Sequence, residues 1–270
     1  NDVLSVTVSV VHRAEHRPEH NIAHQPTSPR DASYDRGRTR RKRAAALCHV
    51  GRYEFDANAL KIVPEWPLVY WWDSGSIAAF RKARLLGSFA HVQQGLATGD
   101  NTRFLRLPFE CSANSVAAVK TRNVPYPLSQ VVWAPYVKGA AGLEWIEPLT
   151  CILEWRRWGL ELKCFHELRY VSFTKRVPNE SSFFAADGVA FSPIGSQFSG
   201  RAYRFRSVFD AAGCTVFGLN PAIVTCLFNS TIARRILSDF NPSISFKNND
   251  VERLPIREIG QADEIFAQVE

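Results

Sequence analysis

The residues best suited to binding chemistry lie together between Gln93 and Leu107, in the sequence QQGLATGDNTRFLRL. Gly95 and Gly99 would let backbone N–H groups approach a ligand closely, because glycine carries no Cβ atom. The Thr and Asn side chains donate and accept hydrogen bonds, and arginine presents a planar fork of donors suited to phosphate or to the edge of guanine. These residues fit a binding loop, and they fit equally a polar β-hairpin loop with two solvated arginines.

Two further basic positions have the same two interpretations. Lys138 follows a Pro-Tyr-Val run and precedes a glycine, so a rigid turn would present its ammonium group as a phosphate contact. The alternative is an ordinary hairpin turn. Arg201 precedes a predicted strand, Tyr203–Phe209, on which Arg204 and Arg206 would share one face. Such a face fits DNA binding and fits a solvent-facing strand equally.

No catalytic or metal-binding set is evident. The sequence has no Walker loop, no HExxH and no serine in a nucleophile elbow, and Glu144 and Glu147 are predicted to be solvated loop positions. Histidines recur at intervals of four at positions 12, 16, 20 and 24, but Pro18 would break a helix that aligned them. We therefore predict neither catalytic nor metal-ligating residues, and a disordered or atypical basic linker over residues 1–46.

Composition points to a globular, basic protein. The chain has 270 residues, 46% hydrophobic and 12% aromatic, with a net charge of +7 that favours a polyanionic partner. Residues 1–50 alone carry +4 of that charge, so the remainder is only mildly basic. The six cysteines form no CxxC pair, as expected for buried thiols in a reducing cytoplasm, and no apolar run approaches the roughly 18 residues of a membrane span. The absence of methionine suggests a piece of a longer reading frame.

The pattern of apolar residues predicts an α+β fold, with mixed or antiparallel short strands and a few packing helices. A helix is predicted to start at Asp73–Ser76 and to run to about Leu86, and another to open at Asn220 and Pro221. The predicted strands are 89–92, 103–107, 129–133 (ended by Pro135), 149–155, 171–173, 189–191, 203–209 and 215–217. Residues 158–166 fit helix or strand.

Several segments, taken in order, resemble the target-recognition region of PglX-type adenine-specific DNA methyltransferases of the BREX phage-exclusion systems. These enzymes are related to the type IIG and TaqI-like restriction-modification methylases. The similar segments are Gly95–Asn101, Arg103–Arg106, Ile62–Pro64, Val69–Trp71, Trp133–Gly139, Phe198–Arg201, Phe209–Gly213, Asn229–Ser230, Asn241–Phe246 and Asp250–Pro255. Together they cover about residues 53–258.

The resemblance implies a fold of the TaqI-like specificity-domain type over residues 47–258. Residues 259–270 are predicted from their own sequence to form the start of a truncated helix. It implies double-stranded DNA as partner, contacted by Thr98, Gly99, Asn101, Arg103, Arg106, Lys138 and Arg201. It also implies an upstream methyltransferase domain in the same polypeptide, and further defence-system proteins as potential partners. The expected location is the cytoplasm, without membrane attachment.

Methylation of adenine needs a glycine loop for S-adenosylmethionine and an Asn/Asp-Pro-Pro-aromatic loop for the flipped base. This sequence has no Pro-Pro pair and no G-x-G, and Asn123–Tyr126 imitates the second loop only in part. We expect no cofactor in this chain and S-adenosylmethionine in the full-length enzyme. One alternative is a protein-interaction or scaffold domain whose seven tryptophans form a partner surface. Another is an inactive remnant.

Overall fold

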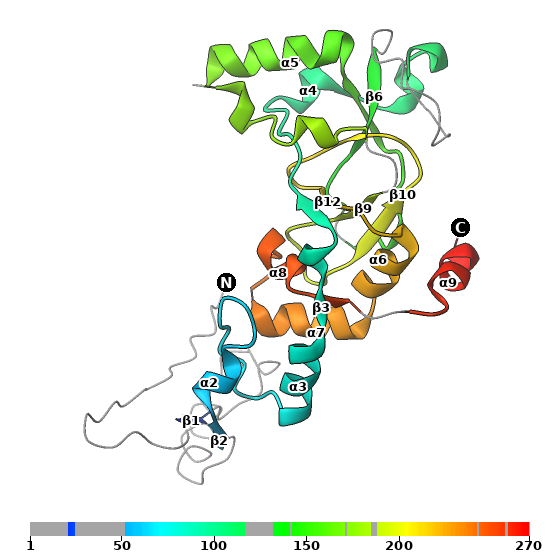
Figure 1. The fold of residues 1–270 in the computed structure, drawn as a ribbon. Coiled ribbons are helices and arrows are strands. Elements are labelled where there is room, and N and C mark those ends of the chain that lie inside the picture. Colours follow the sequence, from blue (N-terminus) through cyan, green and yellow to red (C-terminus); the bar gives the residue numbers. More distant parts are fainter. Residues whose placement is uncertain are drawn as a thin grey trace, which may run out of the picture. The chain divides into compact units, whose positions relative to one another are not determined.

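The computed structural model describes residues 21–24, 52–116, 132–140, 142–170, 172–184, 188–241, 243–256 and 259–269 (Figure 1). The chain divides into two compact units, residues 1–83 and 84–270, which we treat separately. Of the predicted linker over residues 1–46, only Asn21–His24 falls within the described residues, and Asn123–Tyr126 lies outside them.

The described residues of unit 1 form one strand pair and two helices. Strand β1 (Asn21–His24) pairs antiparallel with β2 (Arg52–Phe55), and helices α2 (Ala57–Leu60) and α3 (Ser74–Lys82) follow. Helix α3 starts where the sequence predicts, because the Asp73 carboxylate accepts a hydrogen bond of 2.6 Å from the Ser76 N–H. It ends at Lys82, four residues before the predicted end.

The described residues of unit 2 form two main sheets. Their strand orders are β4-β12-β9-β10-β7 and β11-β6-β8-β5, and a short β13-β3 pair accompanies them. The strands are β3 (Arg84–Leu85), β4 (His91–Gln93), β5 (Leu105–Arg106), β6 (Trp133–Val137), β7 (Trp145–Ile146), β8 (Cys151–Glu154), β9 (Gly188–Phe191), β10 (Gly200–Tyr203), β11 (Val208–Phe209), β12 (Cys214–Phe217) and β13 (Pro255–Ile256). Because most pairs are antiparallel while β7–β10 and β6–β11 are parallel, the predicted α+β class with mixed short strands is confirmed.

Helices cover the two ends of unit 2. They are α4 (Asn101–Phe104), α5 (Arg156–Arg169), α6 (Pro221–Phe228), α7 (Thr231–Phe240), α8 (Asn248–Glu252) and α9 (Ala262–Val269). Figure 1 shows α4 and α5 together at the end near β6, and α7 and α8 at the opposite end of the unit. In the described part of the chain, no helix combines the length and the apolar character that crossing a bilayer requires.

Among the described residues, two large apolar cores hold the sheets and helices together, and a smaller cluster packs α6 against α9. One packs the five-stranded sheet against α6, α7 and α8, and its centre is a ring cluster in which Phe198 lies 4.9 Å from Phe228 and 5.1 Å from Phe246. The other packs the four-stranded sheet against α4 and α5, with Phe104 buried 5.2 Å from Phe165. The second core therefore fixes the end of the unit that carries α4 and α5.

Three strand predictions need correction. Residues 103–107, predicted as one strand, form the end of α4 and then β5, because the Asp100 side chain caps the helix. Pro135 lies inside β6 and does not end it, since β11 reaches only Tyr136 and β6 has a single neighbouring strand at Pro135. Phe173 starts a short 3-10 helix and not a strand. Residues 158–166, for which helix and strand were both open, fall within α5, although Trp158 and Gly159 have left-handed φ/ψ angles.

The predicted strand Tyr203–Phe209 was also wrong in part. Strand β10 ends at Tyr203 and β11 begins at Val208, so Arg204 and Arg206 lie between strands. The alternation that would place both arginines on one strand face therefore does not apply to them.

Candidate functional site

The segment between Gln93 and Leu107, which we call the candidate loop, is held at its start by hydrogen bonds to the segment around Phe209. Leu96 donates its N–H to the carbonyl of Phe209 over 2.9 Å, and Ala211 donates to the carbonyl of Leu96 over 2.9 Å. Gly95 is buried beside them, and a Cβ atom there would lie 1.8 Å from the Phe209 carbonyl oxygen. Only glycine permits this approach of two backbones. The loop is therefore positioned by β11 and not by its own turn sequence alone.

The tip of the loop is an internally bonded turn. The buried hydroxyl of Thr98 donates to Oδ1 of Asn101, and Oδ1 of Asp100 accepts from the N–H of Arg103 over 3.1 Å. Gly99 has φ +71°, a left-handed conformation that favours glycine, and it is exposed together with Asn101. Thr98 thus stabilises the turn, whereas Gly99 and Asn101 are exposed, although Oδ1 of Asn101 is bonded to Thr98.

The buried side chain of His166 contacts the turn on its inner side. The ring of His166 in α5 is fully buried, and its Nε2 lies 2.8 Å from the carbonyl oxygen of Ala97. A Cβ atom on Gly99 would lie 3.0 Å from its Cε1. Burial lowers the pKa of His166, with the Ala97 carbonyl acting in the opposite direction and Arg176 reinforcing the decrease. The ring is therefore neutral at pH 7, with the proton on Nε2 donated to Ala97.

This arrangement predicts a pH dependence of stability. Because the pKa of His166 is lower in the folded protein than its ordinary 6.5, protons bind the unfolded chain preferentially as the pH falls below that value. We compare the protein with His166→Gln, whose amide nitrogen can still donate to Ala97 and does not titrate. The difference between their free energies of unfolding should shrink from pH 7 to pH 5 in urea titrations. A difference independent of pH would contradict the assignment.

Both arginines of the loop region are held by neighbours. The guanidinium of Arg103 donates to Oε1 of Glu161 from Nη2 over 2.7 Å and from Nε over 3.1 Å, and it lies 5.3 Å from the Phe165 ring centre. Arg106 donates to the carbonyls of Thr102 and Leu105 over 2.8 and 2.7 Å. Arg103 and Glu161 are 48% and 50% exposed, so this pair lies on the surface and can exchange partners.

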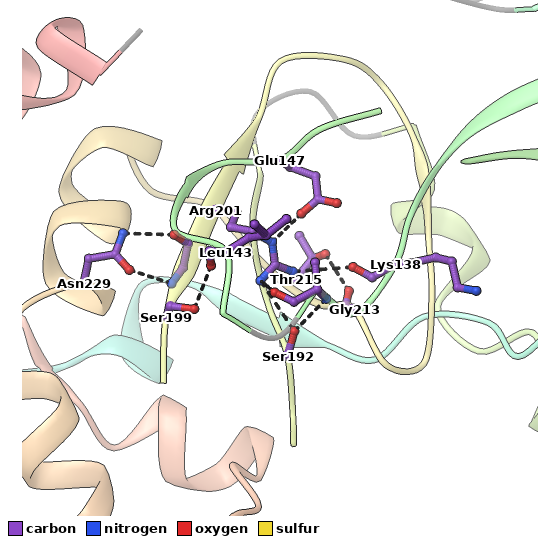
Figure 2. Close-up of polar contacts among 11 residues, drawn as sticks. Lys138, Leu143, Glu147, Ser192, Ser199, Arg201, Gly213, Thr215 and Asn229 are labelled. Atoms are coloured by element: carbon purple, nitrogen blue, oxygen red, sulfur yellow. Dashed lines mark hydrogen bonds and ion pairs between the residues drawn. The ribbon is translucent and has the colours of Figure 1, made fainter. Parts of the chain in front are cut away.

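Arg201, by contrast, is buried, and its guanidinium group lies among the polar groups that Figure 2 labels. Its side chain is 0% exposed, and its Nε donates to Oε2 of Glu147 over 2.5 Å. Its two terminal nitrogens donate to the carbonyls of Ala140, over 3.1 Å, and Lys138, over 3.4 Å. The structure therefore does not support the predicted direct DNA contact by Arg201, because every part of its fork is directed into the protein.

Glu147 was also predicted wrongly, as a solvated loop residue. It is 4% exposed, and burial raises its pKa even though the charge and hydrogen bond of Arg201 act to lower it. The desolvation of the carboxylate thus outweighs its ion pair. Such a pair is worth little as net stability, but removal of one partner leaves a buried charge uncompensated.

The buried pair anchors the turn that carries Lys138. The Ala140 N–H donates to Oγ of Ser192 over 2.9 Å, and the Gly200 backbone exchanges hydrogen bonds of 2.9 and 3.0 Å with the Asn229 side chain. Figure 2 shows the Lys138 side chain pointing away from this cluster. Lys138 is half-buried and presents its ammonium group from a turn whose backbone is fixed by Arg201.

Five of the predicted residues are brought together and two are not. Thr98, Gly99, Asn101, Arg103 and Arg106 share one loop and its short helix. Lys138 is connected to the candidate loop through Asp210. The Asp210 N–H donates to the carbonyl of Val137, next to Lys138, over 2.8 Å, and Asp210 forms an isolated β-bridge with Leu96 of the loop. Arg201 is buried and donates hydrogen bonds to the backbone of the turn that carries Lys138.

Comparison with known proteins gives a similarity over most of the chain. No family model matches the chain. The chain is 23% identical over 202 residues to a protein of Lacticaseibacillus casei (strain Zhang) named adenine-specific methyltransferase PglX. This chain is a distant relative of that protein. The match covers 72% of this chain and 16% of the relative, so this chain corresponds to a small part of the relative's length.

Proposed function

We propose that this chain is the DNA target-recognition region of a PglX-like, site-specific adenine methyltransferase in a phage-defence or restriction-modification system. The observation that carries the proposal is the similarity to a protein named as an adenine-specific methyltransferase, over most of this chain. The candidate loop adds support, because it presents hydrogen-bonding groups of Asn101, Arg103 and Arg106 from a clamped backbone.

The loop and the Lys138 turn divide the work of recognition in this proposal. Lys138 binds phosphate and fixes the register on the duplex, while the exposed amide of Asn101 reads a base edge in a groove. Arg103 exchanges Glu161 for a phosphate or for guanine when DNA binds, which its surface position permits. Thr98 keeps the turn in shape.

The chemistry of methyl transfer belongs to other parts of the protein in this proposal. The sequence contains neither a G-x-G nor a Pro-Pro pair, so no segment of it fits the S-adenosylmethionine loop or the loop that holds a flipped adenine. In the described residues, no group of three or more His, Cys, Asp or Glu side chains is placed to hold a metal ion. In this proposal the chain supplies DNA-binding specificity, and the S-adenosylmethionine site of the enzyme lies outside it.

Substitutions in the surface pair Arg103–Glu161 should change the DNA affinity in opposite directions, which provides a test. Binding of a fluorescent double-stranded DNA should weaken steeply between about 50 and 200 mM salt. Arg103→Ala should lower the affinity about fivefold and reduce the salt slope by about 1, because one phosphate or base contact is lost. Glu161→Gln should raise the affinity roughly twofold, because it removes the competing carboxylate.

Arg235→Ala is the matched control, since Arg235 is exposed on α7, at the end of unit 2 opposite α4. It should bind DNA as the unaltered protein does. Absent or salt-insensitive DNA binding would refute the proposal. If Arg103→Ala and Glu161→Gln bind DNA with equal affinity, the candidate loop is not part of the DNA-binding surface.

A further inference from the structure

A second surface element near the candidate loop has an unusual backbone. Strand β8 is followed by Trp155, Arg156, Arg157, Trp158 and Gly159, which we call the WRRWG turn. The φ/ψ angles of its last three residues are 52°/45°, 63°/36° and 70°/27°, all in the left-handed region. Non-glycine residues adopt this conformation at a cost, so the surrounding structure must hold them in it.

The turn is fixed by its first and last residues. Trp155 is 1% exposed, and its ring lies 5.6 Å from that of Phe183 and 6.0 Å from that of Phe184. The Trp155 N–H donates to the Val132 carbonyl over 2.9 Å, and a Cβ atom on Gly159 would lie 2.8 Å from the Trp155 ring. The middle of the turn is therefore held rigidly away from the core.

The middle residues present charge and aromatic surface to solvent. Arg156 and Arg157 are exposed, and within the described part of the chain neither side chain has an ion pair or a hydrogen bond. Trp158 is 50% exposed, although tryptophan is highly buried on average. The nearby Arg103 and Lys163 are, in contrast, paired with Glu161 and Glu180. Positive charge that is not paired with any described carboxylate, beside an open aromatic face, complements a polyanion that carries flat bases.

We propose that the WRRWG turn is a second DNA-contacting element, and this inference rests on the proposed function. Arg156 and Arg157 bind phosphates, and Trp158 stacks on a base where the duplex is locally opened. An enzyme that modifies a base takes it out of the stack, so a rigid aromatic group beside the recognition loop has a defined use. Arg156–Gly159 of the turn form the first residues of α5, which lies with α4 at the same end of unit 2 (Figure 1).

Two DNA probes separate stacking from charge. One is a fully paired duplex, and the other is the same duplex with one adenine opposite an abasic site. The unaltered protein should bind the opened duplex several-fold more tightly, and Trp158→Ala should abolish this preference while Trp158→Phe retains part of it. Arg156→Ala with Arg157→Ala should weaken binding to both probes about equally and lower the salt slope by about 2.

The control removes the same charge elsewhere. Arg235→Ala with Lys247→Ala changes two exposed residues of α7 and the segment before α8, and it should leave both affinities and the salt slope unchanged. Near-UV circular dichroism confirms that each variant is folded. One outcome is that the unaltered protein binds DNA and Arg103→Ala weakens this binding, while the turn variants leave it unchanged. In that case the proposed function stands, and the inference about the WRRWG turn is overturned in favour of a protein partner. If the unaltered protein binds neither probe, both are overturned.

Discussion

Replacement of Arg201 by alanine is expected to lower the free energy of unfolding by roughly 3–5 kcal/mol. The substitution leaves the carboxylate of Glu147 in the interior without its cation, and it removes the donors to the carbonyls of Lys138 and Ala140. Each of these groups was desolvated on folding, so each costs free energy when it loses its partner. Urea unfolding followed by tryptophan fluorescence measures the effect.

Two comparisons make this expectation specific. Arg235→Ala, on the exposed face of α7, should change stability by less than about 0.5 kcal/mol. The double variant Arg201→Met with Glu147→Leu removes both buried charges and should recover part of the loss, but not all of it, because the two carbonyls still lack donors. A loss below about 1 kcal/mol for Arg201→Ala would show that the pair is not buried as described.

A second large effect is expected at Gly95. A Cβ atom there would lie 1.8 Å from the Phe209 carbonyl oxygen, and backbone cannot move aside as a flexible side chain can. Gly95→Ala should therefore cost about 3 kcal/mol or more, at the upper end of what overpacking costs. In the folded fraction, the loop should be displaced from β11, which hydrogen exchange at the Leu96 and Ala211 amides would detect.

Gly260→Ala is the matched substitution, because nothing lies within 4 Å of the position its Cβ atom would take. That variant should be as stable as the unaltered protein or slightly more stable, since alanine restricts the unfolded chain. Equal stability of the Gly95 and Gly260 variants would contradict the described clamp.

The starts of two helices, α3 and α6, were predictable from local capping signals in the sequence. Helix α6 begins where the Asn-Pro pair predicts, because Asn220 accepts a hydrogen bond of 2.9 Å from the Ala222 N–H and Pro221 occupies the first helical position. Helix α3 starts behind Asp73 for the same reason. In both cases the signal and the structure it specifies lie within a few residues of each other.

Helix α4 was missed although its signal was local. The apolar residues Phe104 and Leu105, flanked by arginines, resemble a strand, and the chain does form strand β5 from Leu105 onward. The four residues before it became helical because Asp100 caps them. A capping residue thus prevailed over a short alternating pattern, which carries little information over five residues.

Features that depend on residues distant in sequence could not be predicted. The role of Arg201 depends on Glu147, which lies 54 positions earlier, and sequence alone shows two charged residues that are normally exposed. The outward WRRWG turn likewise depends on the burial of Trp155 against Phe183 and Phe184. The candidate loop itself was identified from its residue types, but its clamp by Phe209 was not.

The most direct test of the central claim is a selection of binding sites from a pool of double-stranded DNA with random sequence. The protein should enrich sequences that share one adenine-containing site, because a target-recognition region discriminates by base-edge contacts as well as by phosphate contacts. Asn101→Ala should relax the preference at one position of that site while it preserves most of the affinity. Enrichment of no common sequence, or no binding to the pool, would contradict the account.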